Sequence, residues 1–324
     1  MVSSCIQGVS PNSLRTPIQT FAMEKVVEET TLSKKTAIDM HLRKAVITAA
    51  GVGTRLLPIS KELPKEMLPI FSRGKSGLIL KPLLQALFEQ LYDAGLVEFC
   101  FVVGRGKRAI QDHFTPDDSF LRYLEESGKS NFSGEMRAFY EKVAKSSIVW
   151  VNQPAPKGFG DAVLMAKSFV GNDDFVVAAG DTYIVSTGAR FLKKLVKVHT
   201  STNAQATLLV LEVEDPRQYG VIDVLEDERG LRVISAIEKP ETSKSDLAIM
   251  PSYIFKPEIF RALESTSPDM GGELQLTDAI QKLVDWGLDV YAVRLDRHEI
   301  RLDVGTPQTF WEAIRLSHEI MSKA

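Results

Sequence analysis

The sequence predicts an α/β fold, in which helices flank a mixed and mostly parallel central sheet. Residues 44–50 are apolar on both faces, which is the pattern of a buried parallel strand. Residues 80–94 have helical spacing and end at Gly95, and residues 99–103 form a second apolar run. A strand, a helix and a strand in this order imply a right-handed crossover, which makes the two strands parallel.

The alternation of strands and helices continues along the chain. Residues 116–145 read as an insertion with two helical patterns, which residues 127–134 separate. We expect further strands at 147–151, 175–179, 206–213, 221–224, 231–238, 248–255, 290–293 and 300–304, and helices at 160–168, 257–264, 276–286 and 307–321.

Residues 1–42 differ from the rest because they are polar and rich in serine and threonine. We expect them to form a weakly ordered extension. Residues 43–324 then form one domain, with a first part at about 43–185, a second at about 186–306, and a closing helix at 307–321.

Composition excludes several classes of function. The chain of 324 residues is 44% hydrophobic and 25% charged, as in an ordinary globular protein. A net charge of −3 argues against a broad nucleic-acid surface, so a bound anion needs a few well-placed cations. Two cysteines make no disulfide framework, and the five histidines show no zinc pattern. Without a membrane-length apolar run or a signal-peptide pattern, we expect a cytoplasmic protein that binds neither nucleic acid nor membrane.

A glycine-rich loop follows the first predicted strand, with the sequence AAGVGTRLLP at residues 49–58. Its two glycines allow the backbone to turn sharply and bring N–H groups close to a phosphate or a base. A dinucleotide fingerprint would need a third glycine, where Leu56 stands. A P-loop would need a glycine at Pro69, with a strand before it. A plain structural turn leaves unexplained why Arg55, Lys61 and Lys65 crowd into one stretch, as the cations of a phosphate clamp do.

The loop GVGTRLLP at 51–58, followed by PKEMLP at 64–69, closely resembles the signature of sugar-nucleotide pyrophosphorylases. The form is most similar to that of the bacterial-type UTP–glucose-1-phosphate uridylyltransferases, and the resemblance covers about 43–318. It implies a Rossmann-like nucleotidyltransferase fold, with a nucleotide-binding first part and a smaller, β-rich sugar-binding second part.

The resemblance implies a set of nucleotide-binding residues. An amide such as that of Gln153 carries a donor and an acceptor, which suits the edge of uracil or thymine. The alternative for this segment is a loop that only caps the next helix. Relatives usually have GLGHA where this chain has GFGDA at 158–162, which leans toward thymidylyl relatives and leaves the base open. The expected nucleotide-binding residues are Ala50, Gly51, Gly53, Thr54, Gln153 and Gly158.

Asp181 directly follows the strand at 175–179, at the edge where open α/β sheets bind their ligands. An aspartate after a glycine is also a common turn residue. By resemblance, Asp181 and Asp303 are ligands of Mg²⁺, a hard ion that prefers carboxylate and phosphate oxygens.

The resemblance also implies a sugar pocket. Glu238 would contact sugar hydroxyls and Lys239 the sugar phosphate, although such a charge pair at a strand end could also be a solvated edge. Thr277 and Asp278 could equally stabilise a helix start. The sugar-binding set is Tyr219, Gly220, Glu238 and Glu273.

The implied reaction transfers a uridylyl group from UTP to glucose 1-phosphate by Mg²⁺-assisted in-line attack, giving UDP-glucose and pyrophosphate. Arg55, Lys65 and Lys239 would be the catalytic cations. Thymidylyl transfer from dTTP is the nearest alternative. A regulatory homologue without turnover disagrees with the presence of all these charged residues, and an NAD-dependent oxidoreductase disagrees with Leu56. We also expect a homo-oligomer, either a dimer or a tetramer.

Overall fold

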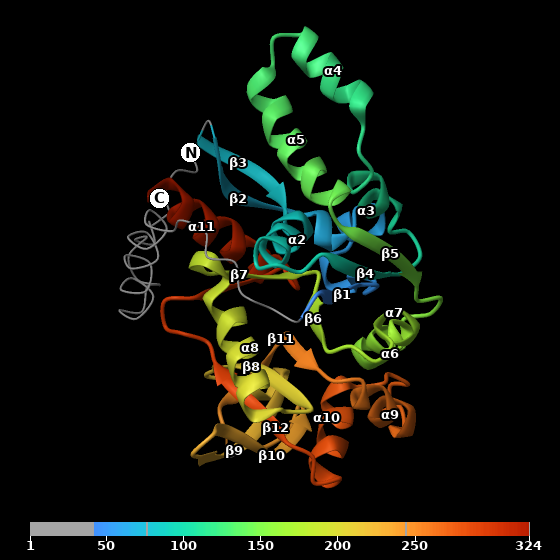
Figure 1. Cartoon of the computed structure of the whole chain (residues 1–324), viewed down its shortest axis with the longest axis vertical. Helices are drawn as coiled ribbons and strands as arrows, with labels where there is room; N and C mark the ends of the chain where they lie inside the picture. The colour runs from blue at the N-terminus through green and yellow to red at the C-terminus, as the bar shows by residue number, and fades with distance from the viewer. Residues whose placement is uncertain (1–41, 76, 244, 324) are drawn as a thin grey trace, which may run out of the picture.

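The computed structural model describes residues 42–75, 77–243 and 245–323. The extension predicted at 1–42 therefore lies outside the described residues, apart from Leu42. Figure 1 shows a central sheet with helices on both faces and a pair of helices that protrudes at one end.

The sheet is mixed, as the sequence predicts. Its first four strands, from β5 to β6, all run parallel. Beyond β6, strand β11 is antiparallel to both β6 and β8, β12 is parallel to β8, and β10 and β9 form an antiparallel edge. The order across the sheet is β5 (Ser147–Asn152), β4 (Glu98–Val103), β1 (Lys44–Ala49), β6 (Phe175–Ala179), β11 (Leu247–Phe255), β8 (Ala206–Glu212), β12 (Val290–Arg294), β10 (Gly230–Glu238) and β9 (Gly220–Asp227).

Helices cover both faces of the sheet and bury two separate hydrophobic clusters. On one face lie α2 (Leu83–Asp93), α3 (Arg108–His113), α5 (Ser130–Ala144) and α8 (Arg190–Thr202). On the other lie α6 (Phe159–Met165), α7 (Lys167–Val170), α9 (Glu258–Ser265) and α10 (Leu276–Asp285).

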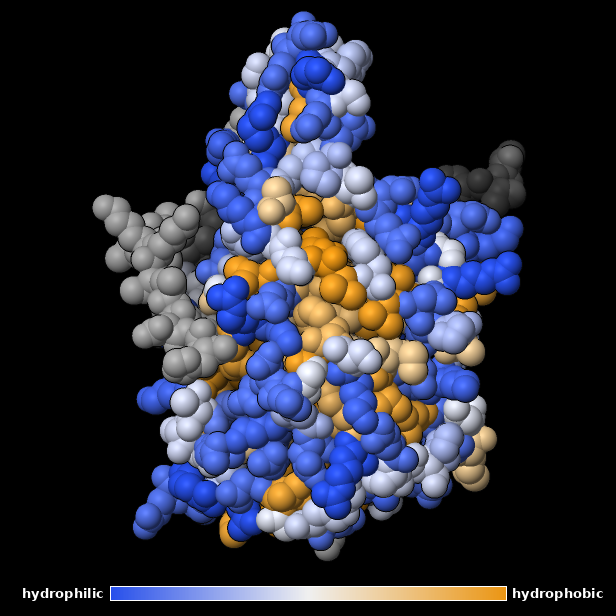
Figure 2. Space-filling view, turned by 45° about the vertical axis from the view of Figure 1, so that its right-hand side comes forward, coloured by the Kyte–Doolittle hydropathy of each residue, from blue (hydrophilic) through white to orange (hydrophobic). Residues whose placement is uncertain are grey.

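The insertion predicted at 116–145 contains α4 (Asp118–Glu126), which packs against α5 and protrudes with it from the body of the molecule (Figure 1). Figure 2 shows that this protrusion is largely hydrophilic, whereas hydrophobic side chains reach the surface in the middle of the same face. The protrusion therefore reads as a pair of solvent-exposed helices.

A third hydrophobic cluster joins parts of the chain that are far apart in sequence. The closing helix α11 (Pro307–Lys323) packs against the hairpin of β2 (Pro69–Gly74) and β3 (Gly77–Pro82). It also packs against β13 (Ile300–Asp303), which pairs antiparallel with β7 (Thr182–Val185). Next to that pairing the N–H of Val304 donates to the carbonyl of Asp181 at 3.0 Å, so the segments of Asp181 and Asp303 lie side by side.

Several elements differ from the sequence prediction. The helix expected from residue 80 begins at Leu83, because 77–82 form strand β3 and Pro82 precedes the first helical turn. Helices α3 and α8 and strands β2, β3 and β7 were not predicted. In the sequence of α8, three lysines are interspersed with the apolar residues that face the core. They interrupt the apolar run, so the helical spacing of the buried residues is difficult to recognise from the sequence.

Among the residues that the structure describes, no helix has the length and the apolar character that crossing a membrane requires.

The core on the α2 face is built around Phe88. Its ring lies 4.7 Å from that of Phe99, 5.2 Å from that of Phe114 and 6.1 Å from that of Phe139. We expect Phe88→Ala to lower the free energy of unfolding by about 3–5 kcal/mol, because it removes a buried aromatic side chain and leaves a cavity. Denaturant unfolding checks this, with Phe132→Ala as the control; Phe132 is 65% exposed on α5, so its loss should stay within about 0.5 kcal/mol. Equal losses in the two variants would contradict this account of the core.

Candidate active site

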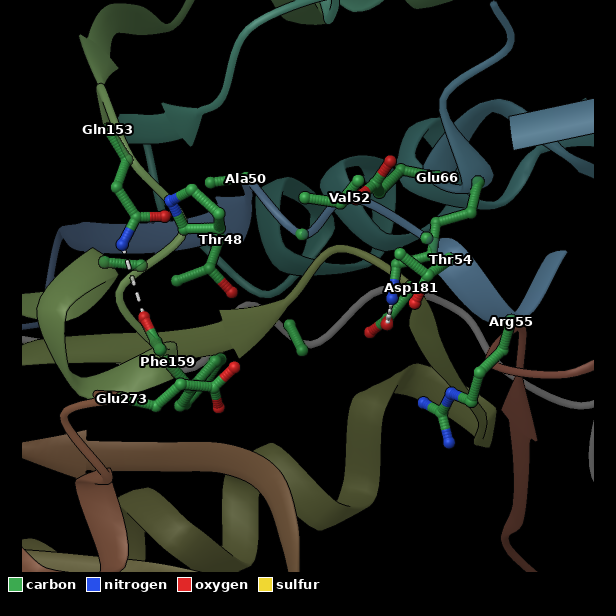
Figure 3. Close-up of a pocket in the computed structure, with 17 residues that line it drawn as sticks. Thr48, Ala50, Val52, Thr54, Arg55, Glu66, Gln153, Phe159, Asp181 and Glu273 are labelled. Atoms are coloured by element: carbon green, nitrogen blue, oxygen red, sulfur yellow. Dashed lines mark hydrogen bonds and ion pairs between the residues drawn. The ribbon is translucent and has the colours of Figure 1, made fainter. Parts of the chain in front are cut away.

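A cavity of about 480 Å³ opens at the carboxyl ends of β1 and β6. Open α/β sheets bind their ligands at this edge, outside the carboxyl ends of the strands. The cavity is lined by all six predicted nucleotide-binding residues and by four further predicted site residues, Arg55, Lys65, Asp181 and Glu273 (Figure 3).

The glycine-rich loop lines one side of the cavity. Gly53 has a φ of 72°, in the left-handed region that favours glycine, and a 3₁₀ turn, η1 (Thr54–Leu56), follows it. The Ser60 hydroxyl donates to the Gly53 carbonyl at 2.7 Å and fixes the turn. A Cβ at Gly104 would lie 2.8 Å from the carbonyl oxygen of Ala50, so the neighbouring loop packs closely against this one. The loop is thus held rigidly with its backbone facing the cavity.

Lys65 and Asp181 form an ion pair inside the cavity (Figure 3). Burial alone would lower the pKa of Lys65, but the charge and the hydrogen bond of Asp181 outweigh it and raise that pKa. Burial alone would raise the pKa of Asp181, but Lys65 and then Arg301 outweigh it and lower that pKa. Both groups are therefore held in their charged forms at neutral pH.

A second ion pair involves Glu66, the residue that follows Lys65. Lys107 donates to Glu66 at 2.7 Å, and the two side chains are only 7% and 1% exposed. Burial raises the pKa of Glu66, and the charge of Lys107 opposes that rise. The pair ties the turn η3 (Lys65–Met67) to the start of α3 and so positions Lys65. This pair could not be predicted from the sequence, since nothing local links positions 66 and 107.

Gln153 lies at the other end of the cavity and is buried. Its Nε2 donates to the Gly158 carbonyl at 3.2 Å and to Asp161 Oδ2 at 2.7 Å. No side chain caps α6, so the alternative of a helix-capping loop has no support from a cap hydrogen bond. Gln153 and Gly158, which the resemblance pairs with the base, therefore lie together at one end of the cavity. Their contact with a base stays a prediction.

The loop at Gly158, beside Gln153, is bonded to the segment that carries Glu273. The Gly160 N–H donates to the Leu274 carbonyl at 2.9 Å, and the Leu274 N–H donates to the Lys157 carbonyl at 2.7 Å. A Cβ on Gly158 or Gly160 would lie 2.8 Å or 2.7 Å from the same Leu274 oxygen, so both positions require glycine. This close approach brings Glu273 into the cavity.

Asp303 does not line the cavity but lies beside it. Arg301 donates to Asp303 Oδ1 at 2.6 Å, and a Cβ placed on Gly305 would be 2.8 Å from Asp303 Oδ2 and 3.4 Å from Arg55 Nη2. The side chains of Asp303 and Arg55 therefore both lie close to Gly305. The charge of Asp303 also acts on Lys65 and contributes to its raised pKa.

The carboxylates of Asp181 and Asp303 are the only acidic pair predicted to hold a metal. In the described part of the chain, no group of three or more His, Cys, Asp or Glu side chains could hold a metal ion. Two carboxylates fit Mg²⁺, which commonly takes one or two protein carboxylates and completes its shell with water and substrate phosphates.

The predicted sugar-binding residues other than Glu273 gather where β9 and β10 meet. Glu238 accepts from Thr277 Oγ1 at 2.7 Å and pairs with Lys239 Nζ at 3.1 Å. A Cβ on Gly220 would lie 2.5 Å from Thr277 Oγ1, so glycine is required there. None of these residues lines the cavity.

Lys239 has an unusual backbone in this cluster. Its φ is 40°, in the left-handed region, and its N–H donates to the Tyr219 carbonyl at 3.0 Å. The Arg301 guanidinium lies 5.6 Å from the centre of the Tyr219 ring, which links this group to the Asp303 side. Thr277 donates a hydrogen bond to Glu238, and no side chain caps the start of α10.

The family model of nucleotidyl transferases matches residues 44–319. The chain belongs to the nucleotidyl transferase family.

Two members of the family are similar to this chain along most of its length. This nucleotidyl transferase is 42% identical over 251 residues to the UTP–glucose-1-phosphate uridylyltransferase of Bacillus subtilis, which covers 75% of this chain and 80% of that protein. It is 40% identical over 274 residues to the enzyme of the same name from Staphylococcus haemolyticus, with 82% and 88% covered.

A solved structure of UTP-bound UGPase from Acinetobacter baumannii is similar to the fold, with a TM-score of 0.74 and 30% identity over 87% of this chain and 96% of that one. A UDP-glucose pyrophosphorylase complexed with UDP-glucose matches with a TM-score of 0.71 and 29% identity, over 87% and 100%. The predicted family and the predicted nucleotidyltransferase fold are confirmed.

The buried pair of Glu66 and Lys107 gives a test of how Lys65 is positioned. We expect Lys107→Met to lower the free energy of unfolding of this nucleotidyl transferase by about 3–5 kcal/mol, because it leaves a buried carboxylate without its partner. Urea unfolding measures the loss, and the double variant Glu66→Gln/Lys107→Met should recover most of it.

The pH dependence of that loss has a definite sign. Because burial raises the pKa of Glu66 in the native protein, the native state takes up the proton more readily than the unfolded chain. Removing the charge of Lys107, which opposes this rise, raises the pKa of Glu66 further in the variant than in wild type. The loss of unfolding free energy in Lys107→Met should therefore become smaller as the pH falls and larger as it rises. A deficit that is additive in the double variant and independent of pH would contradict the coupling.

Proposed function

We propose that the chain transfers a uridylyl group from UTP to glucose 1-phosphate, giving UDP-glucose and pyrophosphate. The observation that carries the proposal is one cavity in which a glycine-rich loop, two cations, a carboxylate and a buried amide meet. The relatives that are 40–42% identical to the chain bear the name of this activity.

The nucleotide would bind across the glycine-rich loop. The backbone of Gly51 and Gly53 would approach the phosphates, as glycine-rich loops do in other nucleotide-binding proteins. Gln153 and Gly158 would face the base, with Ala50 and Thr54 alongside. The buried position of the Gln153 amide supports this, since a polar group taken from water is best satisfied by a partner in the ligand.

The sugar phosphate would enter from the side of Glu273. Glu238 and Glu273 would accept hydrogen bonds from sugar hydroxyls, and Tyr219 and Gly220 would shape the pocket around the ring. Lys239 would hold the sugar phosphate. Their arrangement supports this, since four of these residues contact one another or Thr277, and the fifth, Glu273, lines the cavity.

The reaction needs no general base, because the phosphate of the sugar is already an anion at neutral pH. Its oxygen attacks the α-phosphorus in line, a bond forms between them, and the bond from the α-phosphorus to the bridging oxygen breaks. Pyrophosphate leaves with that oxygen. Two anions are brought together, so positioning and neutralisation of charge supply the rate.

The chain's own cations fit these needs. Arg55 would hold the departing β- and γ-phosphates, Lys65 would neutralise charge near the α-phosphate, and Lys239 would fix the nucleophile. Mg²⁺ held by Asp181 and Asp303 would supply further positive charge to the phosphates. Lys65 and Arg301 pair with those carboxylates, and each has a long side chain that can also reach a phosphate.

Pyrophosphate release tests the proposed activity directly. Each common nucleoside triphosphate is assayed against glucose 1-phosphate and a few other sugar phosphates, with Mg²⁺ and with a chelator. We expect the highest kcat/KM with UTP and glucose 1-phosphate, and strong loss on chelation. Release from no pair would sink the catalytic proposal, whereas dTTP well above UTP would overturn only the choice of base.

Lys65→Met tests the role of charge neutralisation. We expect kcat to fall by about 10²–10³-fold, the scale on which loss of one electrostatic donor acts in a preorganised site. Lys197→Met on α8 is the matched control, because Lys197 is exposed and lies outside the cavity. Circular dichroism checks that both variants fold. A Lys65→Met enzyme within threefold of the control would remove Lys65 from the mechanism.

A further inference from the structure

The amide of Gln153 has one defined orientation. Both hydrogens of its Nε2 have partners, since Nε2 donates to the Gly158 carbonyl and to Asp161 Oδ2. In Figure 3 the dashed line from the Gln153 nitrogen is its bond to the Gly158 carbonyl, and the oxygen Oε1 points away from that bond. The free end of this buried amide is therefore a hydrogen-bond acceptor.

The partners of Nε2 explain why the amide does not rotate. A backbone carbonyl and a carboxylate have only acceptor oxygens. Turning the amide over would place Oε1 against both of them, and two acceptors in a buried place would lose two hydrogen bonds and repel one another. The bond to Asp161, at 2.7 Å, is the shorter of the two and has a charged partner, which makes it the stronger.

Asp161 can hold this role because of its position. It lies in the first turn of α6, and Gly158 directly precedes that helix. Its side chain is therefore directed back along the helix toward the loop, as side chains in a helix point to the N-terminal end. The mechanism gives Asp161 no contact with the reacting atoms.

The orientation decides which pyrimidine the site accepts. Uracil carries a hydrogen on N3, which an acceptor such as Oε1 satisfies. Cytosine has a lone pair on N3, so Oε1 would meet another acceptor there, and a buried mismatch of this kind is strongly rejected. Thymine has the same N3 hydrogen as uracil, so this device does not separate those two bases.

We propose that Asp161 is a positioning residue that sets the nucleotide specificity of the enzyme, by fixing the Gln153 amide with its acceptor toward the base. The inference rests on the proposed use of UTP. Asp161 acts through Gln153 and selects bases with a hydrogen on N3 over cytosine.

Binding of UTP and CTP without sugar phosphate tests the inference independently of turnover. Isothermal titration with Mg²⁺ gives the two dissociation constants for wild type, Asp161→Asn and Asp161→Ala. We expect the preference of wild type for UTP over CTP to fall about tenfold in both variants, mainly through weaker binding of UTP. Asparagine has a donor as well as an acceptor and so permits either amide orientation, and alanine removes the partner altogether.

The matched control is Asp112→Asn, the same loss of charge at an exposed position on α3. It should leave the UTP to CTP ratio unchanged. A double variant with Gln153→Ala separates positioning from a general effect on structure. If Asp161 acts through Gln153, then Asp161→Asn should have no further effect on the ratio once Gln153 is alanine.

Three results would overturn the inference: no preference for UTP in wild type, a ratio within twofold of wild type in both Asp161 variants, or an undiminished effect of Asp161→Asn in the Gln153→Ala background. If one Asp161 variant fails to fold, the other decides. Failure of the proposed function would look different, since wild type would then release no pyrophosphate while its binding ratios still respond to Asp161.

Discussion

The ion pair of Lys65 and Asp181 is the interaction on which the site depends. It joins the segment after the glycine-rich loop to the end of β6, and both of its members are charged because each keeps the other so. Beneath it, Lys107 and Glu66 fix the turn that carries Lys65. A cavity meant for two phosphate-bearing substrates must hold cations close together, and pairing each cation with a carboxylate limits their repulsion before a ligand arrives.

The second organising constraint is the contact between the loop at Gly158 and the segment at Leu274. Because Gly158 and Gly160 lie against the Leu274 carbonyl, the placement of this loop and that of Glu273 depend on each other. The proposed sites for the base and the sugar would share this contact. They also lie near the junction of β6 with β11, where the sheet changes from parallel to antiparallel neighbours.

The parallel half of the fold could be predicted because its strands are apolar on both faces and alternate with clear helical stripes, as in β1 and α2. The glycine-rich loop and its cations could be predicted for the same reason: their signal is local. Strand β13 was also predicted, but the short strand β7 and its pairing with β13 were not, since they join residues more than a hundred positions apart. Contacts such as Glu66 with Lys107, or Asp161 with Gln153, depend on how loops fold back, and residue type alone does not specify them.

The backbone of Lys239 has a consequence for how this chain evolves. A left-handed φ at a residue with a side chain costs on the order of 1–3 kcal/mol, a strain that glycine would avoid. Lys239, to which the proposed function gives the sugar phosphate, stands where glycine would be more stable. With that role, Lys239→Gly would relieve the strain and remove a needed charge at once, so stability and activity would change in opposite directions.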